Sequence, residues 1–204
     1  GILSDDEIKQ SLENTLIFDN FEGITIDTEI KMPHICENPK QELRDIINKE
    51  WSEREVNEID SNRINEYLEA IREEMQIIED TNMSEYFVLD YKIMKLGKEK
   101  YGGVLTRTGR GSAPSFYVNK LLRFTDIDRL SSSVKLFPSR FMSTVRILET
   151  KSLPDIDMNT ADPKPYIQAS KDILGEDGVY YMVAYKPLQD ASAFRLWCKA
   201  NDMN

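Results

Sequence analysis

Apolar residues recur every three or four positions along most of this chain, which is the spacing of amphipathic helices. A first helix is expected from residue 4 to about residue 20, because Ser4 and Glu7 have the spacing of an N-terminal capping box. The same periodicity predicts further helices over 41–50, 62–80, 86–101, 115–122, 166–174 and 190–200. The helices at 41–50 and 62–80 are rich in acidic side chains, so each is expected to bury an apolar stripe and expose a charged face.

Three other stretches have the composition or the alternation of β-strands. Residues 21–30 alternate apolar and polar side chains, which predicts a strand or an extended linker. Val104-Leu105 is expected to form a short buried strand, and residues 179–185 are rich in valine and tyrosine, as buried strands are. Helices and strands are therefore expected to mix along one chain.

Charge is distributed unevenly along the chain. A length of 204 residues allows one substantial core, and we expect one main domain with a net charge of −10. Residues 1–100 contain 12 Lys and Arg against 25 Asp and Glu, whereas residues 101–204 contain 14 against 11. Eight basic residues and only two acids lie between residues 107 and 146. This region would attract a polyanion, although a solvated surface with an incidental bias of charge has the same composition.

The sequence lacks the features that are typical of membrane-spanning, secreted and metal-binding cysteine proteins. No apolar run approaches the length of about 18 residues that a membrane span needs, and the N-terminal sequence lacks the pattern of a secretory signal. Cys36 and Cys198 lie far apart without the spacing of a metal site, so we expect reduced thiols and a cytoplasmic setting. His34 is the only histidine and has no partner at ligand spacing, which favours a structural or surface role.

The stretch Gly109-Arg110-Gly111-Ser112 lies between an expected strand and an expected helix. Small residues allow several backbone N–H groups to surround one anion, and Arg110 adds a permanent positive charge. The first N–H groups of the helix over 115–122 would then face a phosphate held by the loop. These features predict a phosphate-binding loop, although glycine-rich turns also occur without a ligand.

A second stretch, Leu153-Pro154-Asp155-Ile156-Asp157, carries two carboxylates at alternate positions. In an extended segment Asp155 and Asp157 would lie on one side and Ile156 on the other. Mg²⁺ often takes two carboxylates and completes its shell with water and phosphate oxygens. Thr125-Asp126-Ile127-Asp128 has the same spacing of acids, but its residue types are typical of a turn or a helix cap.

Four motifs in this order resemble the bacterial C-family replicative DNA polymerases, the family of the DNA polymerase III alpha subunit. They are the loop Gly109-Arg110-Gly111-Ser112, the turn Thr125-Asp126-Ile127-Asp128, the segment Arg140-Phe141 with Arg146, and Leu153-Pro154-Asp155-Ile156-Asp157. The segment around Tyr86-Phe87 is similar to the helix that precedes the phosphate loop in that family. The resemblance covers nearly the whole chain.

The resemblance implies an α+β (mixed α/β) fold, namely a polymerase-β-like nucleotidyltransferase palm with flanking helices. Residues 1–30 would be a linker or the end of a preceding domain, and residues 31–204 a palm domain that is incomplete at its C-terminus. Asp155 and Asp157 would be the catalytic residues and would hold two Mg²⁺ ions. The triphosphate of an incoming deoxynucleoside triphosphate (dNTP) would be bound by Arg110, Gly111, Ser112, Arg140 and Arg146.

The same resemblance implies primer–template DNA, dNTP, other domains of a longer polymerase and replisome subunits as partners, with no membrane. Two departures keep other functions open. Ser115-Phe116 replaces the second Gly-Ser of the family's loop. The family's Phe-Gly-Thr segment is lost, and Tyr185-Lys186-Pro187 stands in its place. The family's third metal carboxylate lies beyond residue 204, so we expect the isolated chain to lack polymerase activity. The alternatives are a degenerate palm that binds nucleic acid or protein, and another kind of nucleotidyltransferase.

Overall fold

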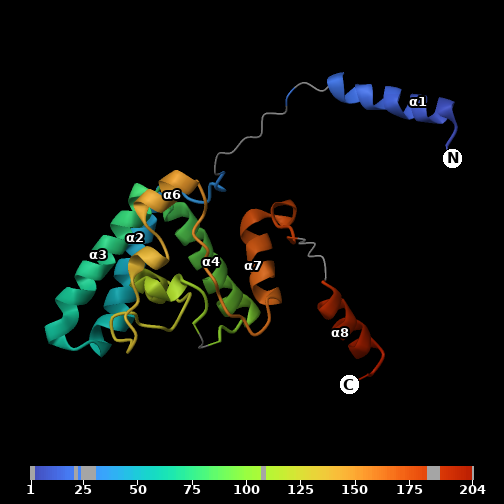
Figure 1. Cartoon of the computed structure of the whole chain (residues 1–204). Helices are drawn as coiled ribbons and strands as arrows, with labels where there is room; N and C mark the ends of the chain where they lie inside the picture. Colours follow the sequence, from blue (N-terminus) through green and yellow to red (C-terminus); the bar gives the residue numbers. More distant parts are fainter. Residues whose placement is uncertain (1–2, 21–22, 24–30, 107–108, 183–188, 204) are drawn as a thin grey trace.

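The computed structural model describes residues 3–20, 23, 31–106, 109–182 and 189–203, and it is mostly helical over these residues (Figure 1). The α-helices are α1 (Asp5–Thr15), α2 (Pro39–Glu50), α3 (Ile64–Asp80), α4 (Ser84–Tyr101), α5 (Tyr117–Leu121), α6 (Thr144–Thr150), α7 (Lys164–Leu174) and α8 (Asp190–Ala200). Shorter helical turns are η1 (Leu16–Asn20), η2 (Trp51–Glu55), η3 (Val56–Glu58), η4 (Ser61–Arg63), η5 (Ala113–Ser115), η6 (Pro138–Arg140) and η7 (Glu176–Gly178).

The helix predictions from hydrophobic periodicity are confirmed to within a few residues at each end. The capping box is present, because the Ser4 hydroxyl accepts from the Glu7 N–H while the Glu7 carboxylate accepts from the Ser4 N–H at 2.7 Å. The expected helix over 115–122 is shorter than predicted. Its first residues form the separate turn η5, which contains Pro114, and α5 starts only at Tyr117.

The core lies where α2, α3, α4 and α5 pack together. Phe87 on α4 is fully buried and packs edge to face against Phe141, with ring centroids 6.3 Å apart. Phe116 packs against the other side of Phe141, with centroids 4.9 Å apart. Other fully buried side chains of this core are Leu43, Ile78, Val88, Tyr117, Leu121, Leu122 and Met142. The segment that follows the glycine-rich loop is thus anchored on α4 through Phe141.

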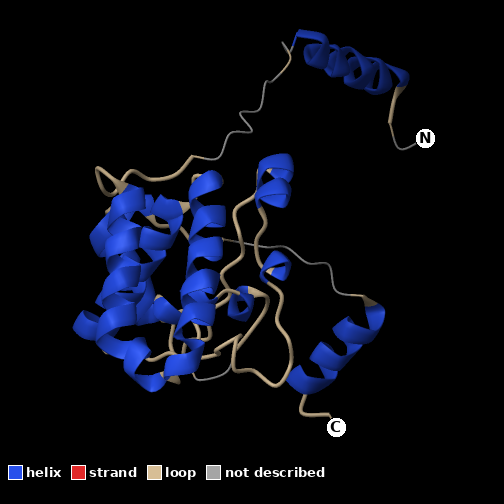
Figure 2. Ribbon diagram, turned by 90° about the vertical axis from the view of Figure 1, so that its left-hand side faces the viewer, coloured by secondary structure: helices blue, strands red, loops and turns tan. Residues whose placement is uncertain are grey.

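Helix α7 lies along α4, and glycine makes this close approach possible (Figures 1 and 2). The ring of Tyr166 lies directly over Gly97 and Gly103, so that a Cβ atom at either glycine would overlap the ring. These glycines were predicted only as the end of the α4 helix. The structure shows that they also make room for the Tyr166 ring.

The mixed sheet of the expected palm is not found in the described residues (Figure 2). Their β pairing consists of one isolated antiparallel bridge between Leu105 and Thr160, so the expected strand at Val104-Leu105 is reduced to a bridge. The expected strand at 179–185 is unpaired over residues 179–182 and exposed over 180–182, and residues 183–185 lie outside the described ones. The expected strand or linker over 21–30 also lies almost wholly outside them. The expectation of an α+β fold is therefore supported only in its helical part, because a strand-like composition makes a strand only where a partner edge is available.

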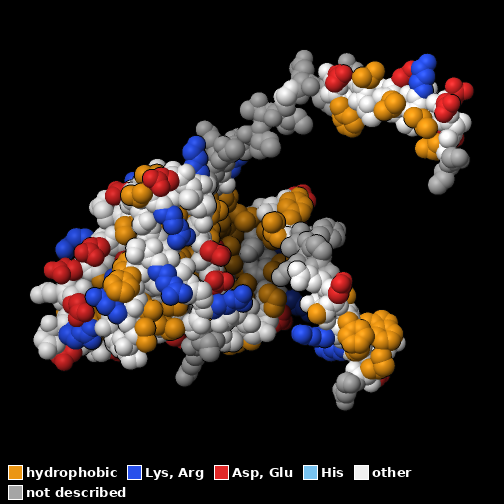
Figure 3. Space-filling model, in the orientation of Figure 1, with side chains coloured by type: hydrophobic (Ala, Val, Ile, Leu, Met, Phe, Trp, Pro, Cys, Tyr) orange, Lys and Arg blue, Asp and Glu red, His pale blue; other side chains and the backbone are white. Residues whose placement is uncertain are grey.

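Helices α1 and α8 contribute no side chain to the core. Their apolar residues face outward, and they gather visibly on the surface of α8 (Figure 3). The exposed apolar residues of these two helices and the η1 turn are Ile8, Leu12, Leu16, Ile17, Phe18, Phe194, Leu196 and Trp197. None of the described helices is long and apolar enough to cross a membrane.

Candidate functional site

The glycine-rich loop and the carboxylate pair meet at Gly111 and Asp157. Gly111 has a φ of 63°, in the left-handed region that favours glycine, and a Cβ atom here would overlap the Oδ2 atom of Asp157. Arg110 forms an ion pair with the same carboxylate, with its Nε atom 3.5 Å from Oδ1. Only a residue without a side chain fits at position 111. The two halves of the predicted site, which are separated by more than 40 residues, are therefore adjacent.

Backbone pairing explains how these two segments come together. Leu105 precedes the loop and Thr160 follows the carboxylate pair, and the two form the antiparallel bridge. The Ala161 N–H donates to the Val104 carbonyl at 3.0 Å, and the Thr106 N–H donates to the Asn159 carbonyl at 2.8 Å. The bridge thus brings the start of the loop segment alongside the end of the carboxylate segment.

Along the carboxylate segment the side chains alternate between water and the core. Ile156 is buried in the core cluster, Asp155 is exposed and Asp157 is partly exposed, which agrees with the predicted alternation. Tyr86 on α4 holds the beginning of the segment, because its hydroxyl donates to the Pro154 carbonyl at 3.0 Å. The segment is therefore anchored at both ends and by one apolar side chain between them.

The Thr125-Asp126-Ile127-Asp128 stretch leads into a turn at residues 129–131, and its Thr and Asp side chains accept from nearby backbone N–H groups as predicted. The Asp128 carboxylate accepts from the Leu130 N–H at 2.8 Å and from the Tyr67 hydroxyl at 2.7 Å, while the Thr125 hydroxyl accepts from the Ile127 N–H at 3.2 Å. This stretch also supports the glycine-rich loop. A Cβ atom on Gly109 would overlap the Ile127 side chain, so the loop lies directly against the stretch.

The sequence predicted that the first N–H groups of the helix after the glycine-rich loop would bind a phosphate held there. In the structure the first N–H groups of α5 have another partner. These N–H groups are taken by Glu74 of α3, whose carboxylate accepts from the Val118 N–H at 2.8 Å and also from the Tyr117 N–H. Glu74 is fully buried and pairs with Arg129, with 2.6 Å between Oε1 and Nε. Burial raises the pKa of Glu74, and the Arg129 charge opposes this shift. Sequence reasoning missed Glu74, although it lies on the same apolar stripe as Ile71 and Ile78, where a charged residue indicates a buried partner.

Arg140 and Arg146 lie next to each other, and the Arg146 Nη1 atom is 3.5 Å from the Arg140 carbonyl that accepts from it. Both side chains are exposed. Neither forms a hydrogen bond or ion pair with Asp155, Asp157 or the described part of the glycine-rich loop. Their position is set by Phe141, which packs on Phe116 directly after η5. Ser112, also predicted to contact a triphosphate, is partly exposed at the start of η5, and its carbonyl accepts from the Ser115 N–H at 2.9 Å.

The structure describes seven of the eight basic residues between 107 and 146, and three of these seven pair with acids of the first half of the chain. Besides the pair of Arg129 and Glu74, Lys120 pairs with Glu55, and Arg123 pairs with Glu50 at 2.8 Å. The basic region is therefore partly an internal complement to α2, η2 and α3. Exposed basic residues remain at Arg110, Lys135, Arg140 and Arg146.

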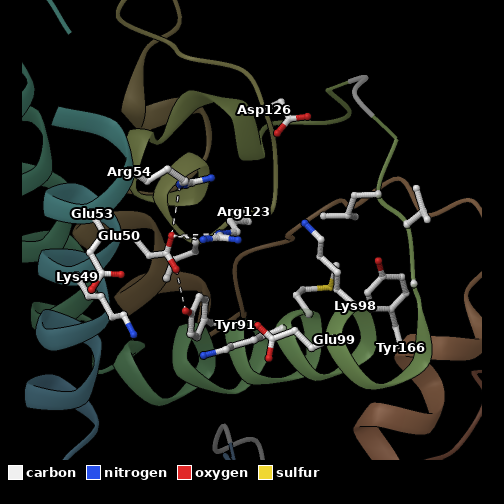
Figure 4. A pocket seen from close by; sticks show the side chains of 16 residues that line it. Lys49, Glu50, Glu53, Arg54, Tyr91, Lys98, Glu99, Arg123, Asp126 and Tyr166 are labelled. Carbon is white, nitrogen blue, oxygen red and sulfur yellow. Dashed lines mark hydrogen bonds and ion pairs between the residues drawn. The ribbon is translucent and has the colours of Figure 1, made fainter. Parts of the chain in front are cut away.

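A separate cavity of about 410 Å³ lies between α2 and α4, and none of the predicted site residues lines it (Figure 4). Glu50 is central to its polar wall. The Glu50 carboxylate accepts hydrogen bonds from Arg123 at 2.8 Å and from the Tyr91 hydroxyl at 2.9 Å, and it lies 3.4 Å from the Arg54 Nε atom. These contacts satisfy a buried carboxylate, so the wall is explained by folding alone.

One further acidic side chain, Asp90 on α4, lies near the carboxylate segment. Asp90, one helical turn after Tyr86, is partly buried and forms no hydrogen bond or ion pair with the residues that the structure describes. Burial raises the pKa of Asp90 to about 7. The negative charges of Asp90 and Asp155, after burial itself, raise the pKa of Tyr86. Within the described ranges no three His, Cys, Asp or Glu side chains form a group that could hold a metal ion.

Comparison with known proteins identifies the family. The family model described as the bacterial DNA polymerase III alpha NTPase domain matches residues 41–204. Among the relatives, the DNA polymerase III subunit alpha of Ureaplasma parvum is 30% identical over 131 residues, 63% of this chain and 13% of that protein. The protein of the same name from Campylobacter jejuni is 30% identical over 148 residues, 72% of this chain and 12% of that protein. The one from Streptococcus pyogenes serotype M1 is 28% identical over 192 residues, 91% of this chain and 17% of that protein.

The chain thus spans less than a fifth of the length of these relatives. The family match covers the glycine-rich loop, the Thr125–Asp128 stretch, the two arginines and the carboxylate pair, all of which lie within residues 41–204. The chain belongs to the family of the bacterial DNA polymerase III alpha NTPase domain.

Proposed function

We propose that this chain is the palm part of a DNA-directed DNA polymerase, which transfers a nucleotide from a dNTP to a primer 3′-hydroxyl. The observation that carries the proposal is the close approach of Gly111 to Asp157, because it brings the predicted phosphate-binding loop next to the carboxylate pair. The name shared by the relatives, DNA polymerase III subunit alpha, supports the same chemistry. The palm would comprise residues 31–204, and residues 1–30 would lead into it from a preceding domain.

The available carboxylates suit Mg²⁺. Asp155 is exposed and Asp157 is partly exposed, so the oxygens of both can be reached from solvent. Mg²⁺ at nucleotide sites is commonly held by one or two carboxylates together with water and phosphate oxygens, and a third protein ligand is not required. Asp155 and Asp157 would hold the ions. When bound, two such ions would activate the attacking hydroxyl and stabilise the leaving phosphate oxygens.

The chain's own residues would bind and orient the triphosphate. The left-handed conformation of Gly111 lets consecutive N–H groups converge on an anion, and the loop carries no side chain at this position to obstruct it. Arg110 pairs with Asp157, so its guanidinium lies at the boundary between the carboxylates and an incoming phosphate. Arg140 and Arg146 are exposed and would bind phosphates of the nucleotide or of primer–template DNA.

A second candidate function is a non-catalytic palm that binds nucleic acid or protein. The observation in its favour is the burial of Ser115 and Phe116, which stand where the loop of the family has a second Gly-Ser. Both residues are buried, and Phe116 anchors the core instead of widening the phosphate site. A palm of this kind would not bind a nucleotide in a metal-dependent way.

The two functions are separated by titrating a dNTP into the 204-residue chain with and without Mn²⁺ or Mg²⁺, followed by calorimetry. We expect binding that requires the metal ion and is lost in Asp155→Asn and in Asp157→Asn. Because both side chains reach solvent, each substitution should change the free energy of unfolding by less than about 0.5 kcal/mol. Binding that is equal in wild type and variants, or no binding by the wild type, would overturn the catalytic proposal.

A matched pair of glycine variants tests whether the close approach of Gly111 to Asp157 matters for nucleotide binding. Gly102 has a φ of 68° with nothing within 4 Å of a Cβ atom, whereas Gly111 has a φ of 63° with Asp157 in the way. Alanine at either position has a similar backbone cost of about 1 kcal/mol. We expect Gly111→Ala to weaken metal-dependent nucleotide binding about tenfold or more, since it displaces a ligand, and Gly102→Ala to leave it unchanged.

A further inference from the structure

The carboxylate segment depends on one side chain of α4 at the point where it begins. Pro154 is buried, and its carbonyl belongs to the peptide group that joins it to Asp155. That carbonyl accepts the Tyr86 hydroxyl at 3.0 Å. The same peptide group leads directly into Asp155, so the hydrogen bond fixes the backbone from which this carboxylate extends.

Tyr86 is well suited to hold this position. Its ring packs edge to face on Phe87, with centroids 6.0 Å apart, and Phe87 is fully buried in the core. A tyrosine in this setting has few accessible rotamers, so its hydroxyl is presented in one place.

We propose that Tyr86 is a positioning residue for Asp155: it fixes the peptide between Pro154 and Asp155 and so sets the place of the Asp155 carboxylate. The effect on the backbone is a property of the chain alone. Its consequence for metal binding rests on the function proposed above. Asp155 has no hydrogen bond of its own to any described residue, so the backbone is what determines its position.

The test compares Tyr86→Phe with Tyr91→Phe. Tyr91 lies on the same helix, is buried, and also uses its hydroxyl for one hydrogen bond, to Glu50 at 2.9 Å. Both variants lose one hydroxyl and keep the ring, so both are expected to fold and to lose a similar, small amount of stability. Only Tyr86→Phe removes a bond to the carboxylate segment.

The first measurement is NMR of the metal-free 204-residue chain. We expect Tyr86→Phe to shift the Pro154 carbonyl and Asp155 amide resonances, and to lower the order parameters of Asp155 and Ile156 from about 0.85 toward about 0.6. Tyr91→Phe should leave all of these at wild-type values. Unchanged order parameters and resonances in Tyr86→Phe would overturn the proposal.

The second measurement is Mn²⁺ titration of the same proteins, followed by electron paramagnetic resonance. We expect the dissociation constant to rise about tenfold in Tyr86→Phe, as is usual when a group that orients a metal ligand is removed, and to stay unchanged in Tyr91→Phe. A wild-type chain whose Mn²⁺ binding does not depend on Asp155 would overturn the proposed function, while the NMR result would still decide the role of Tyr86.

Discussion

Asp90 is a single residue whose environment makes a prediction about pH. It is partly buried on α4, and burial raises its pKa from 3.8 to about 7. The folded protein therefore keeps this proton up to about pH 7, whereas the unfolded chain releases it near pH 4. The free energy of unfolding should consequently fall as pH rises from about 4 to 7, and Asp90 should contribute no further change above that window.

The variant Asp90→Asn has the same shape and cannot ionise, so its free energy of unfolding should not show this fall between pH 4 and 7. We expect it to match the wild type in stability at pH 4 and to exceed it by about 1 to 3 kcal/mol at pH 8, the lower values reflecting partial exposure. Urea unfolding of both proteins across this range measures the difference. A difference that is the same at pH 4 and pH 8 would contradict the prediction.

At the residue scale, the sequence singled out the residues of the candidate site but not the contacts between them. Gly111 and Asp157 were singled out for their residue types and for their resemblance to a family. Their direct contact was not predictable, because it depends on the pairing of Leu105 with Thr160. Tyr86 and Asp90 were missed as site neighbours, since their positions in an apolar helix are typical of core residues.

At the scale of elements, Glu74 connects three segments that lie far apart in the sequence. From α3 it caps α5 and pairs with Arg129 just after the Thr125–Asp128 stretch. Removing the carboxylate leaves a nearly buried guanidinium and two helix N–H groups without partners. We expect Glu74→Ala to lower the free energy of unfolding by about 3 to 5 kcal/mol.

Glu79 on the same helix provides the matched control. It pairs with Arg44 through two hydrogen bonds, but the Arg44 side chain is 53% exposed. Glu79→Ala should therefore cost only about 1 kcal/mol or less. Urea denaturation of both variants, with Glu74→Gln as an intermediate case that keeps an acceptor, gives the comparison. Equal losses for Glu74→Ala and Glu79→Ala would show that the buried pair has no special weight.

The elements differ in how far the sequence determined them, and the reason is physical. A helix satisfies its backbone within one segment, so the apolar spacing in 62–80 was enough to predict α3. A strand needs a partner edge, so the valine and tyrosine content of 179–185 was not sufficient. The prediction that the Thr and Asp side chains of residues 125–128 satisfy nearby backbone donors was correct, because such bonds reach only two residues along the chain.

At the scale of the whole molecule, the uneven charge has a structural explanation. The acidic first half and the basic second half meet in ion pairs, of which those of Glu55, Glu50 and Glu74 are examples. A net charge of −10 therefore coexists with exposed arginines near the candidate site. Composition alone left open whether the basic region binds a polyanion or is incidental. The structure shows a third role, complementarity within the chain.

The two terminal helices lead to the last prediction. Neither α1 nor α8 buries a single residue, although each carries exposed apolar side chains. Isolated helices of this length are marginally stable in water, so α1 and α8 should be unfolded in most molecules at any moment. We expect amide hydrogen exchange to be complete within minutes for α1 and α8, while the amides around Phe87 and Val88 on α4 are protected by a factor of about 1,000 or more, as core helices are. Mass spectrometry of the exchanging chain, at two protein concentrations, measures this.

Protection of α8 equal to that of α4 would contradict the prediction. If that protection increased with concentration, a second copy of the chain would be covering Phe194 and Trp197. If it did not, α8 would be packed against the body of its own chain.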